Sequence, residues 1–189
     1  KIGVIVAMDK ELQQLQHLFD PNRVIVEKCG IGKVNAALGA AEMIRRHKPD
    51  VIVSSGCAGG NGDGINVQDV VVASETAYHD VYCGTAIDDS TVYGQVQGMP
   101  YGLIVTGDWF VDSKEKMRSI VDKFPDLKAV DMESCAIAQT CYLNKVPFIS
   151  FRIISDIPLR DTDASMYHNF WSTIAENSFQ VTRHFVESL

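Results

Sequence analysis

Three carboxylates stand where they could share one site. Glu11, Glu133 and Asp156 each follow an apolar run that predicts a buried strand. Grouped carboxylates can cleave a glycosidic bond, because a protonated one donates a proton to the leaving group while an ionised one activates water. The alternative is that each acid is a solvated loop residue or a helix cap, which the helix dipole would favour for Glu133 and Asp156.

The elements that must position these acids follow from hydrophobic patterning. Short apolar runs rich in β-branched residues predict strands at 1–8, 23–28, 51–55, 69–73, 102–106, 127–130 and 147–154. Amphipathic runs predict helices from residue 9 and at 33–47, 113–123, 134–143 and 164–187, with a long polar stretch at 76–100 and a loop at 155–163. Uniformly apolar strands alternating with helices predict one α/β domain over residues 1–189, with a mixed, largely parallel central sheet flanked by helices.

Such sheets bind ligands beyond the carboxyl ends of their strands. The residues directly after each predicted strand are therefore the candidate site. They are Ala7–Glu11, Cys29–Lys33, Gly56–Gly60, Gly107–Val111, Asp131–Glu133 and Ser155–Asp156.

Two glycine-rich turns invite comparison with phosphate-binding loops. Gly30–Lys33 follows a strand and opens a helix, but it lacks the third glycine of GxGxxG, which favours a tight strand-to-helix turn. The small residues of Gly56–Gly60 would let the backbone approach a ligand closely. Cys57 is a weak nucleophile candidate, because no sequence feature supplies a partner base.

Aromatic residues could line a pocket for a planar base or belong to the core. Phe110, Tyr167 and Phe170 are the candidates, and Phe110 is favoured because it follows a strand. The five histidines show no metal-binding spacing such as HExxH, so we predict no metal and no cofactor. The pair His79-Asp80 is predicted to have a surface or structural role.

Charge and composition exclude several classes of partner. The 189 residues carry a formal net charge of −7, so the chain lacks the basic surface that binds nucleic acid or an anionic membrane. No apolar run reaches the roughly 20 residues of a transmembrane helix. The five cysteines are odd in number and form no CxxC pair. This usage predicts reduced thiols and a cytoplasmic location.

Blocks along almost the whole chain together resemble one family. KIGVIVAMDKE, GIGKVNAALGA, DVIVSSGCAGG, DVVVASETAYHD, YGQVQGMP, TGDWFVD, AVDMESCAIAQ and FRIISD occur in the order of the 5′-methylthioadenosine/S-adenosylhomocysteine nucleosidases, within the nucleoside phosphorylase superfamily. The resemblance implies a nucleoside phosphorylase-like fold and hydrolysis of the N-glycosidic bond of either nucleoside, releasing adenine. It also implies a small-molecule nucleoside substrate and a homodimer, in which the Tyr78–Tyr82 region helps to close the partner's site.

The same resemblance implies residue roles. Asp156 matches the acid that protonates or hydrogen-bonds adenine N7, Ser155 the residue that orients it, and Glu11 the carboxylate that activates water. Glu133 matches the residue that holds the ribose hydroxyls. The other implied substrate-binding positions are Met8 and Met132 near the ribose, Phe110 stacked on adenine, Val111 reading the adenine edge through its backbone, Ile31 and Tyr167 on the alkylthio side, and Cys57.

The sequence departs from the family pattern at a few places. Cys57 stands where serine or threonine is usual, so a hydroxyl contact would be replaced by a weaker thiol contact. Asp131 stands where glutamate is commoner. The chain also lacks a strand pair after residues 20–21 and a helix near residues 100–101, so we expect segments to be omitted there.

Other functions remain open at this stage. A nucleoside phosphorylase would need a basic phosphate clamp, and Arg152 is the candidate, whereas the acidic turn at Asp9 and Glu11 would repel phosphate. A hydrolase of another nucleoside, such as futalosine, would use the same three acids. A nucleoside-binding protein without activity is disfavoured, because a binder gains nothing from burying three acids at a desolvation cost.

Overall fold

The computed structural model describes residues 1–81, 96–97, 102–160 and 164–189. The described strands are β1 (Ile2–Val6), β2 (Val24–Lys28), β3 (Val51–Gly60), β4 (Val70–Val72), β5 (Glu75–Tyr78), β6 (Val96–Gln97), β7 (Leu103–Thr106), β8 (Leu127–Asp131) and β9 (Phe148–Asp156). The described helices are α1 (Asp9–Leu15), α2 (Lys33–His47), α4 (Lys114–Val121), α5 (Ser134–Leu143), α6 (Ser165–Asn169) and α7 (Ala175–Glu187), with a π-helical turn at Phe170–Ile174.

The described strands form one sheet in the order β2-β1-β3-β8-β7-β5-β6, with β9 beside β3 and β4 beside β9. Strand β1 pairs parallel with β2 and β3, β3 with β9, and β7 with β5 and β8. The pairs β3–β8, β4–β9 and β5–β6 are antiparallel. The predicted mixed, largely parallel sheet is therefore confirmed.

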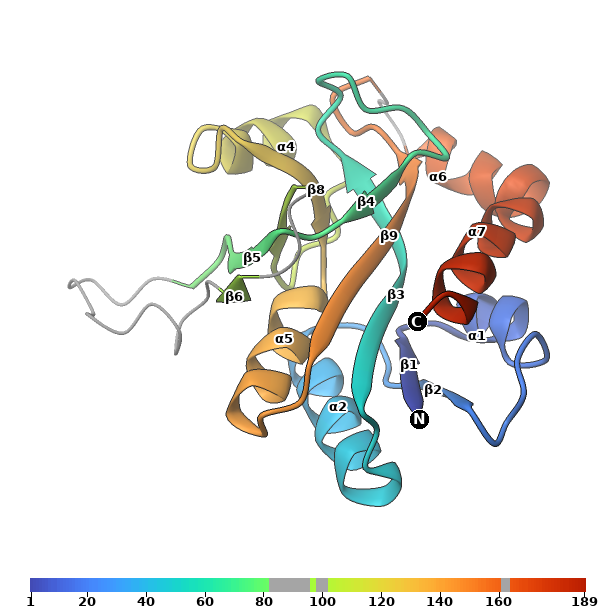
Figure 1. Ribbon diagram of the computed structural model, residues 1–189. Coiled ribbons are helices and arrows are strands. Elements are labelled where there is room, and N and C mark those ends of the chain that lie inside the picture. The colour runs from blue at the N-terminus through green and yellow to red at the C-terminus, as the bar shows by residue number, and fades with distance from the viewer. Residues whose placement is uncertain (82–95, 98–101, 161–163) are drawn as a thin grey trace.

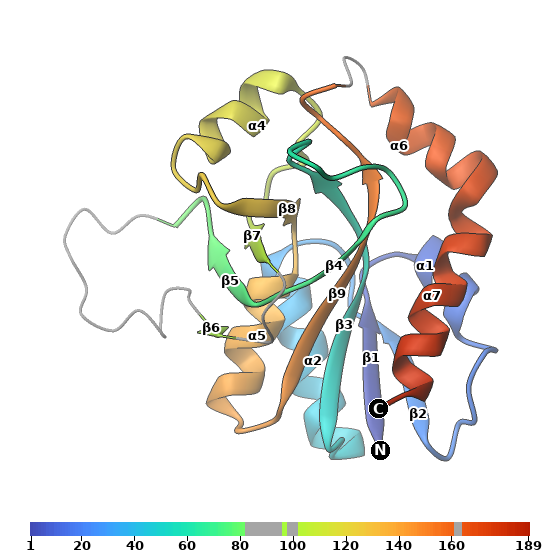
Figure 2. The same ribbon diagram turned by 45° about the horizontal axis from the view of Figure 1, so that its top comes forward.

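Helices cover both faces of the sheet (Figures 1 and 2). In both views α2 and α5 lie on one side of β1 and β3, and α1 and α7 lie on the other. Alternate residues of β1 serve the two layers: Val4 and Val6 belong to the core cluster that contains Phe179 of α7, while Ile5 packs with Met43 of α2. Burial on both faces explains why the sequence of β1 is apolar throughout.

Two strands run further than their sequences predict. Strand β3 continues through Gly56–Gly60, which we expected to be a glycine-rich turn, because Cys57 and Ala58 pair with Ile153 and Ile154 of β9. Strand β9 ends at Asp156 instead of at residue 154. The residues expected in loops after these two strands are therefore held by sheet hydrogen bonds.

The predicted polar stretch 76–100 and the predicted helix 164–187 also need correction. Strand β5 begins at Glu75 and pairs with β7, with Thr76 opposite Ile104. The C-terminal helix is interrupted by the π-helical turn. Nine residues advance an ideal α-helix by about 2.5 turns, which would put Phe170 and Phe179 on opposite sides. The wider π turn changes the phase, and both rings are fully buried in one cluster.

Of the two places where we expected omitted segments, only the first lies among the described residues. Residues 20–21 form part of a turn in which the Arg23 N–H donates to the Asp20 carbonyl, at 3.0 Å. The other place, near residues 100–101, lies outside the described residues, as do Cys83 and Tyr82. Omission of segments stays a prediction.

Candidate active site

One pocket at the carboxyl ends of β1, β3, β7, β8 and β9 collects the three predicted carboxylates. Glu11, Glu133 and Asp156 all line it. The other predicted binding residues line the same pocket: Met8, Ile31, Cys57, Phe110, Val111, Met132, Ser155 and Tyr167. Strand ends far apart in sequence thus bring all eleven candidates together, as expected for a parallel sheet. Their individual roles stay predictions.

Glu11 is fixed by backbone donors from two strand ends. One carboxylate oxygen accepts the N–H groups of Ala7 and Met8 at 2.9 and 3.0 Å, and the other accepts the Cys57 N–H at 3.0 Å. A Cβ at Gly56 would lie only 2.5 Å from Glu11 Oε1, so a glycine is required for this approach. Burial raises the pKa of Glu11, and the three N–H donors and Arg152 partly offset that rise.

Glu133 stands at the start of α5 but does not cap it. The Asp131 side chain caps the helix instead, because its carboxylate accepts the Ser134 N–H at 3.2 Å. The Glu133 side chain makes no cap hydrogen bond. The Glu133 carboxylate instead accepts the Gly32 N–H at 3.0 Å, from the turn before α2. Burial, and next the charge of Asp131, raise the pKa of Glu133 to about 8.

Asp156 is the last residue of β9 and is 8% exposed. The Ser155 hydroxyl donates to Asp156 Oδ1 at 2.6 Å, and Ser155 itself is buried. In the sheet, Asp156 stands opposite Gly59 of β3. A strand end therefore orients this carboxyl group, with a neighbouring hydroxyl as its partner.

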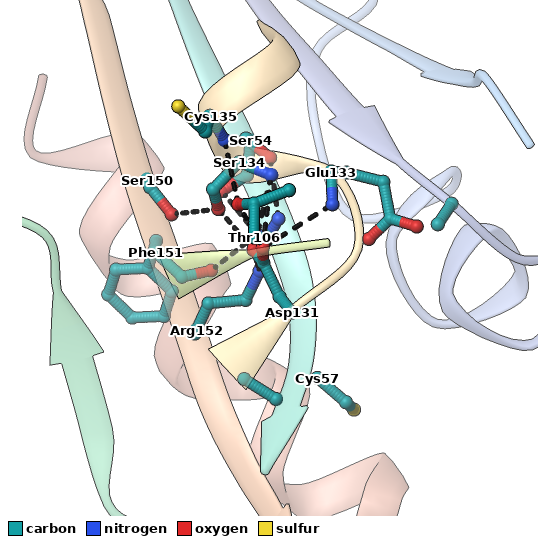
Figure 3. Close-up of polar contacts among 12 residues, drawn as sticks. Ser54, Cys57, Thr106, Asp131, Glu133, Ser134, Cys135, Ser150, Phe151 and Arg152 are labelled. Atoms are coloured by element: carbon teal, nitrogen blue, oxygen red, sulfur yellow. Dashed lines mark hydrogen bonds and ion pairs between the residues drawn. The ribbon is translucent and has the colours of Figure 1, made fainter. Parts of the chain in front are cut away.

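A buried ion pair joins Asp131, which lines the pocket, to Arg152 (Figure 3). Arg152 Nε donates to Asp131 Oδ2 at 2.8 Å, and the guanidinium also donates to the carbonyl and hydroxyl of Ser54, at 2.9 and 2.8 Å. Asp131 also accepts from the Thr106 hydroxyl at 2.6 Å. Arg152 is 2% exposed, so it is a buried counter-ion and does not form the phosphate clamp that the phosphorylase alternative requires.

Two of the three aromatic candidates line the pocket, and the third lies in the core. Phe110 and Tyr167 both line the pocket and contact each other edge to face, with ring centroids 5.4 Å apart. Phe170 is fully buried in the core cluster and lies outside the pocket lining. Trp109, which the sequence analysis did not select, also lines the pocket, and its ring lies 5.4 Å from that of His79.

His79 is buried in the interior, so of its two predicted roles the structure favours the structural one. Across the part of the chain that the structure describes, no group of three or more His, Cys, Asp or Glu side chains could hold a metal ion. Within the same residues, no helix is both long enough and apolar enough to cross a membrane.

The ion pair between Asp131 and Arg152 was not predicted. Each is a charged residue at the end of, or inside, an apolar strand, and a charge in such a place needs a partner. Pairing the two by charge would have found the network from the sequence.

Comparisons with known proteins agree with this geometry. The family model of the phosphorylase superfamily matches residues 1–187. A 5′-methylthioadenosine/S-adenosylhomocysteine nucleosidase of Exiguobacterium sp. is 36% identical, with 94% of each chain covered.

Solved structures show the same relationship. The nucleosidase of that name from Neisseria meningitidis, in complex with methylthio-immucillin-A, superimposes with a TM-score of 0.80 at 33% identity, covering 100% of this chain and 99% of the other. Futalosine hydrolase of Helicobacter pylori superimposes with a TM-score of 0.85 at 25% identity, covering 100% and 97%. The chain belongs to the 5′-methylthioadenosine/S-adenosylhomocysteine nucleosidase family of the phosphorylase superfamily.

Proposed function

We propose that this protein hydrolyses the N-glycosidic bond of 5′-methylthioadenosine or S-adenosylhomocysteine and releases adenine. The observation that carries the proposal is the meeting of Glu11, Glu133 and Asp156 in one pocket. The similarity to the Neisseria meningitidis nucleosidase, solved with a nucleoside analogue, supports the same substrate class.

The space beside Glu11 favours water over phosphate as the nucleophile. A small cavity of about 10 Å³ adjoins the pocket and is lined by Glu11, Cys57, Glu133 and Arg152, among others. A volume on the order of 10–15 Å³ holds one water molecule. The carboxylates that line this cavity and the pocket would repel a phosphate ion.

In the proposed reaction, each of the three carboxylates has a separate role. A water molecule attacks C1′ and gives its proton to Glu11, while the electrons of the C1′–N9 bond pass to the adenine. Asp156, oriented by Ser155, donates a proton to N7 and so neutralises the departing base. Positive charge that develops on the ribose is stabilised by the carboxylates, and Glu133 accepts hydrogen bonds from the ribose hydroxyls.

The remaining pocket residues would bind and orient the nucleoside. Phe110 stacks on the adenine ring, and the backbone of Val111 reads the adenine edge. Met8 and Met132 pack near the ribose, with Cys57 at the floor. Ile31 and Tyr167 line the alkylthio side. No cofactor takes part in this scheme.

We further propose that the protein is a homodimer. Apolar side chains are exposed on neighbouring helices: Val34 (71%) and Leu38 (65%) on α2, and Tyr142 (52%) and Leu143 (67%) at the end of α5. Exposed apolar side chains on two neighbouring helices are candidates for an interaction surface. Light scattering should give twice the chain mass for the wild type and a lower mass for Leu38→Lys, whereas a monomeric wild type would refute the dimer.

We also propose that the protein is located in the cytoplasm. Cys29, Cys57, Cys135 and Cys141 form no disulfide among the described residues. Thiols persist where the compartment is reducing.

The test is adenine release measured by chromatography, with and without phosphate. We expect the wild type to release adenine from 5′-methylthioadenosine without phosphate, and Asp156→Asn to lose at least about 100-fold in kcat, the contribution typical of general acid catalysis. Asp126→Asn, which changes an exposed acid outside the pocket, is the matched control.

Other outcomes would redirect the proposal. Release that depends on phosphate and yields a ribose 1-phosphate would identify a phosphorylase. Release of base from futalosine alone would favour the second candidate, which the similarity to the Helicobacter pylori futalosine hydrolase supports. Full activity in Asp156→Asn would remove Asp156 from the acid role.

A further inference from the structure

Lys33 joins three segments at the rim of the pocket. Its ammonium nitrogen lies 2.8 Å from Asp80 Oδ1, after β5, and 3.7 Å from Asp108 Oδ2, after β7. It also stands 5.3 Å from the centroid of the Tyr78 ring, in a cation–π contact. The side chains of Lys33 and Asp80 are only 21% and 11% exposed, so solvent screens this pair less than an ordinary surface pair.

Backbone donors complete the connection. The Lys33 N–H donates to Asp108 Oδ1 at 2.8 Å, and the Asp108 N–H donates to Asp80 Oδ2 at 2.8 Å. Asp80 thus accepts hydrogen bonds from a side chain and from the main chain, while Asp108 accepts from the main chain and forms a longer ion pair with the Lys33 ammonium. Together these contacts fix the two loops relative to the start of α2. We call Lys33, Asp80 and Asp108 the rim clamp.

The rim clamp is continuous with two walls of the pocket. Asp108 is followed directly by Trp109, Phe110 and Val111, all of which line the pocket. On the other side, Lys33 follows the Ile31-Gly32 turn, whose Ile31 also lines it. Displacing the rim clamp would therefore move both walls.

The turn before α2 also contacts Glu133, the carboxylate that is proposed to hold the ribose hydroxyls. The Gly32 N–H donates to Glu133 Oε1 at 3.0 Å, and Gly32 has φ +92°, a conformation that favours glycine. A Cβ on Gly32 would lie 3.0 Å from Asp108 Oδ1. The first N–H groups of α2 thus hold two carboxylates, Glu133 in the pocket and Asp108 in the rim clamp, where the helix dipole favours negative charge.

We propose that Lys33 is a positioning residue for the reaction: it holds the Gly30–Lys33 turn against the loop 107–111 and so fixes Glu133 and Phe110 for the nucleoside. This role rests on the proposed function, because it needs a substrate between those walls. Lys33 is not in the pocket lining and is not a catalytic residue.

The test compares Lys33→Met, Lys33→Arg and Lys28→Met. Lys28 is a matched control, because it forms the same kind of pair with Asp9 at 2.7 Å on an exposed surface. We expect KM for 5′-methylthioadenosine to rise about tenfold or more in Lys33→Met with a smaller change in kcat, since the lost contacts orient bound substrate. Lys33→Arg should recover most of the loss, and Lys28→Met should behave as the wild type.

A merely structural role gives a different pattern. If Lys33→Met only unfolds a fraction of the molecules, kcat per total protein falls and KM stays unchanged, and this result would overturn the proposal. Equal KM values in the Met and Arg variants would overturn it too, because the positive charge would then be irrelevant.

Asp80→Asn provides a second route if Lys33→Met does not fold. The amide keeps an acceptor oxygen but removes the charge that faces Lys33. We expect KM to rise in this variant, and Lys33→Met to add little in its background, since both changes break one interaction. Full additivity would refute the rim clamp.

Binding of adenine, measured by calorimetry, separates this inference from the proposed function. Wild-type protein that releases no adenine would refute the proposed function, and a matched loss of adenine affinity in Lys33→Met and Asp80→Asn would still support the rim clamp. Unchanged adenine affinity together with unchanged KM would refute the rim clamp while leaving hydrolysis intact.

Discussion

Replacing Arg152 by methionine should be among the most destabilising single changes near the pocket. The guanidinium is 2% exposed and donates to Asp131 and Ser54, so its loss leaves the Asp131 carboxylate buried without its counter-ion. Removing one partner of a buried ion pair costs about 3–5 kcal/mol. That is a large share of the roughly 5–15 kcal/mol by which a domain is stable.

The size of this effect can be measured by urea unfolding. With a slope of about 1–3 kcal/mol/M, a loss of this size moves the unfolding midpoint down by about 1–5 M. Arg183→Met is the matched control, because Arg183 pairs with Glu187 at 2.9 Å but both side chains are over 40% exposed. Exposed pairs contribute about 0–1 kcal/mol. Equal midpoints for the two variants would refute the reasoning.

The stability lost in Arg152→Met should also depend on pH, in a direction set by the pKa of Glu133. The pKa of Glu133 is raised to about 8 mainly by burial, and Arg152 opposes that rise. Without Arg152 the folded-state pKa rises further, so the folded variant binds its proton more tightly than the unfolded chain does. Stability is then lost as the pH rises through the folded pKa. The deficit of Arg152→Met should be larger at pH 9 than at pH 6, and a deficit independent of pH would contradict this.

Two smaller changes test other features. Gly56→Ala would put a methyl group 2.5 Å from Glu11 Oε1. Because the buried carboxylate would have to leave its backbone donors to make room, we expect kcat to fall at least about tenfold and the melting temperature to fall as well, and unchanged kcat would contradict the placement of Glu11. His79 is buried and its pKa is lowered by that burial. Its folded state binds fewer protons than the unfolded chain, so stability falls as the pH drops below about 6.5. His79→Phe should lose less melting temperature between pH 7 and pH 5 than the wild type, and an equal loss would remove His79 as the cause.

The positions of the three acids could be predicted because buried parallel strands have an unmistakable pattern. Strands such as β1 are apolar on both faces, so their carboxyl ends are visible in the sequence, and the sheet topology brings those ends together. Other features gave no such signal. The run Gly56–Gly60 has the composition of a loop, and only its pairing with β9 makes it a strand.

Contacts between distant segments were the hardest to predict. The only sign of the π-helical turn is the angle around the helix axis between Phe170 and Phe179. That angle indicates an irregular turn only once both rings are known to face the same core. The rim clamp depends on Lys33, Asp80 and Asp108, which are charged residues outside the predicted strands. Charged residues in such places are usually solvated, so their sequence pattern does not distinguish a clamp from an ordinary surface.

The charges around the pocket connect its stability with its chemistry. Among the described residues that line the pocket and the adjoining small cavity, four are acids (Glu11, Asp131, Glu133 and Asp156) and one is a cation, Arg152. One guanidinium cannot balance four buried negative charges, so the site favours states in which some of the acids hold protons. Burial raises the pKa of both Glu11 and Glu133, and at Glu133 the charge of Asp131 adds to the rise. Glu11 must be ionised to accept a proton from water, and its three backbone N–H donors and Arg152 favour that form, so the residue that stabilises the fold around Asp131 also supports the proposed role of Glu11.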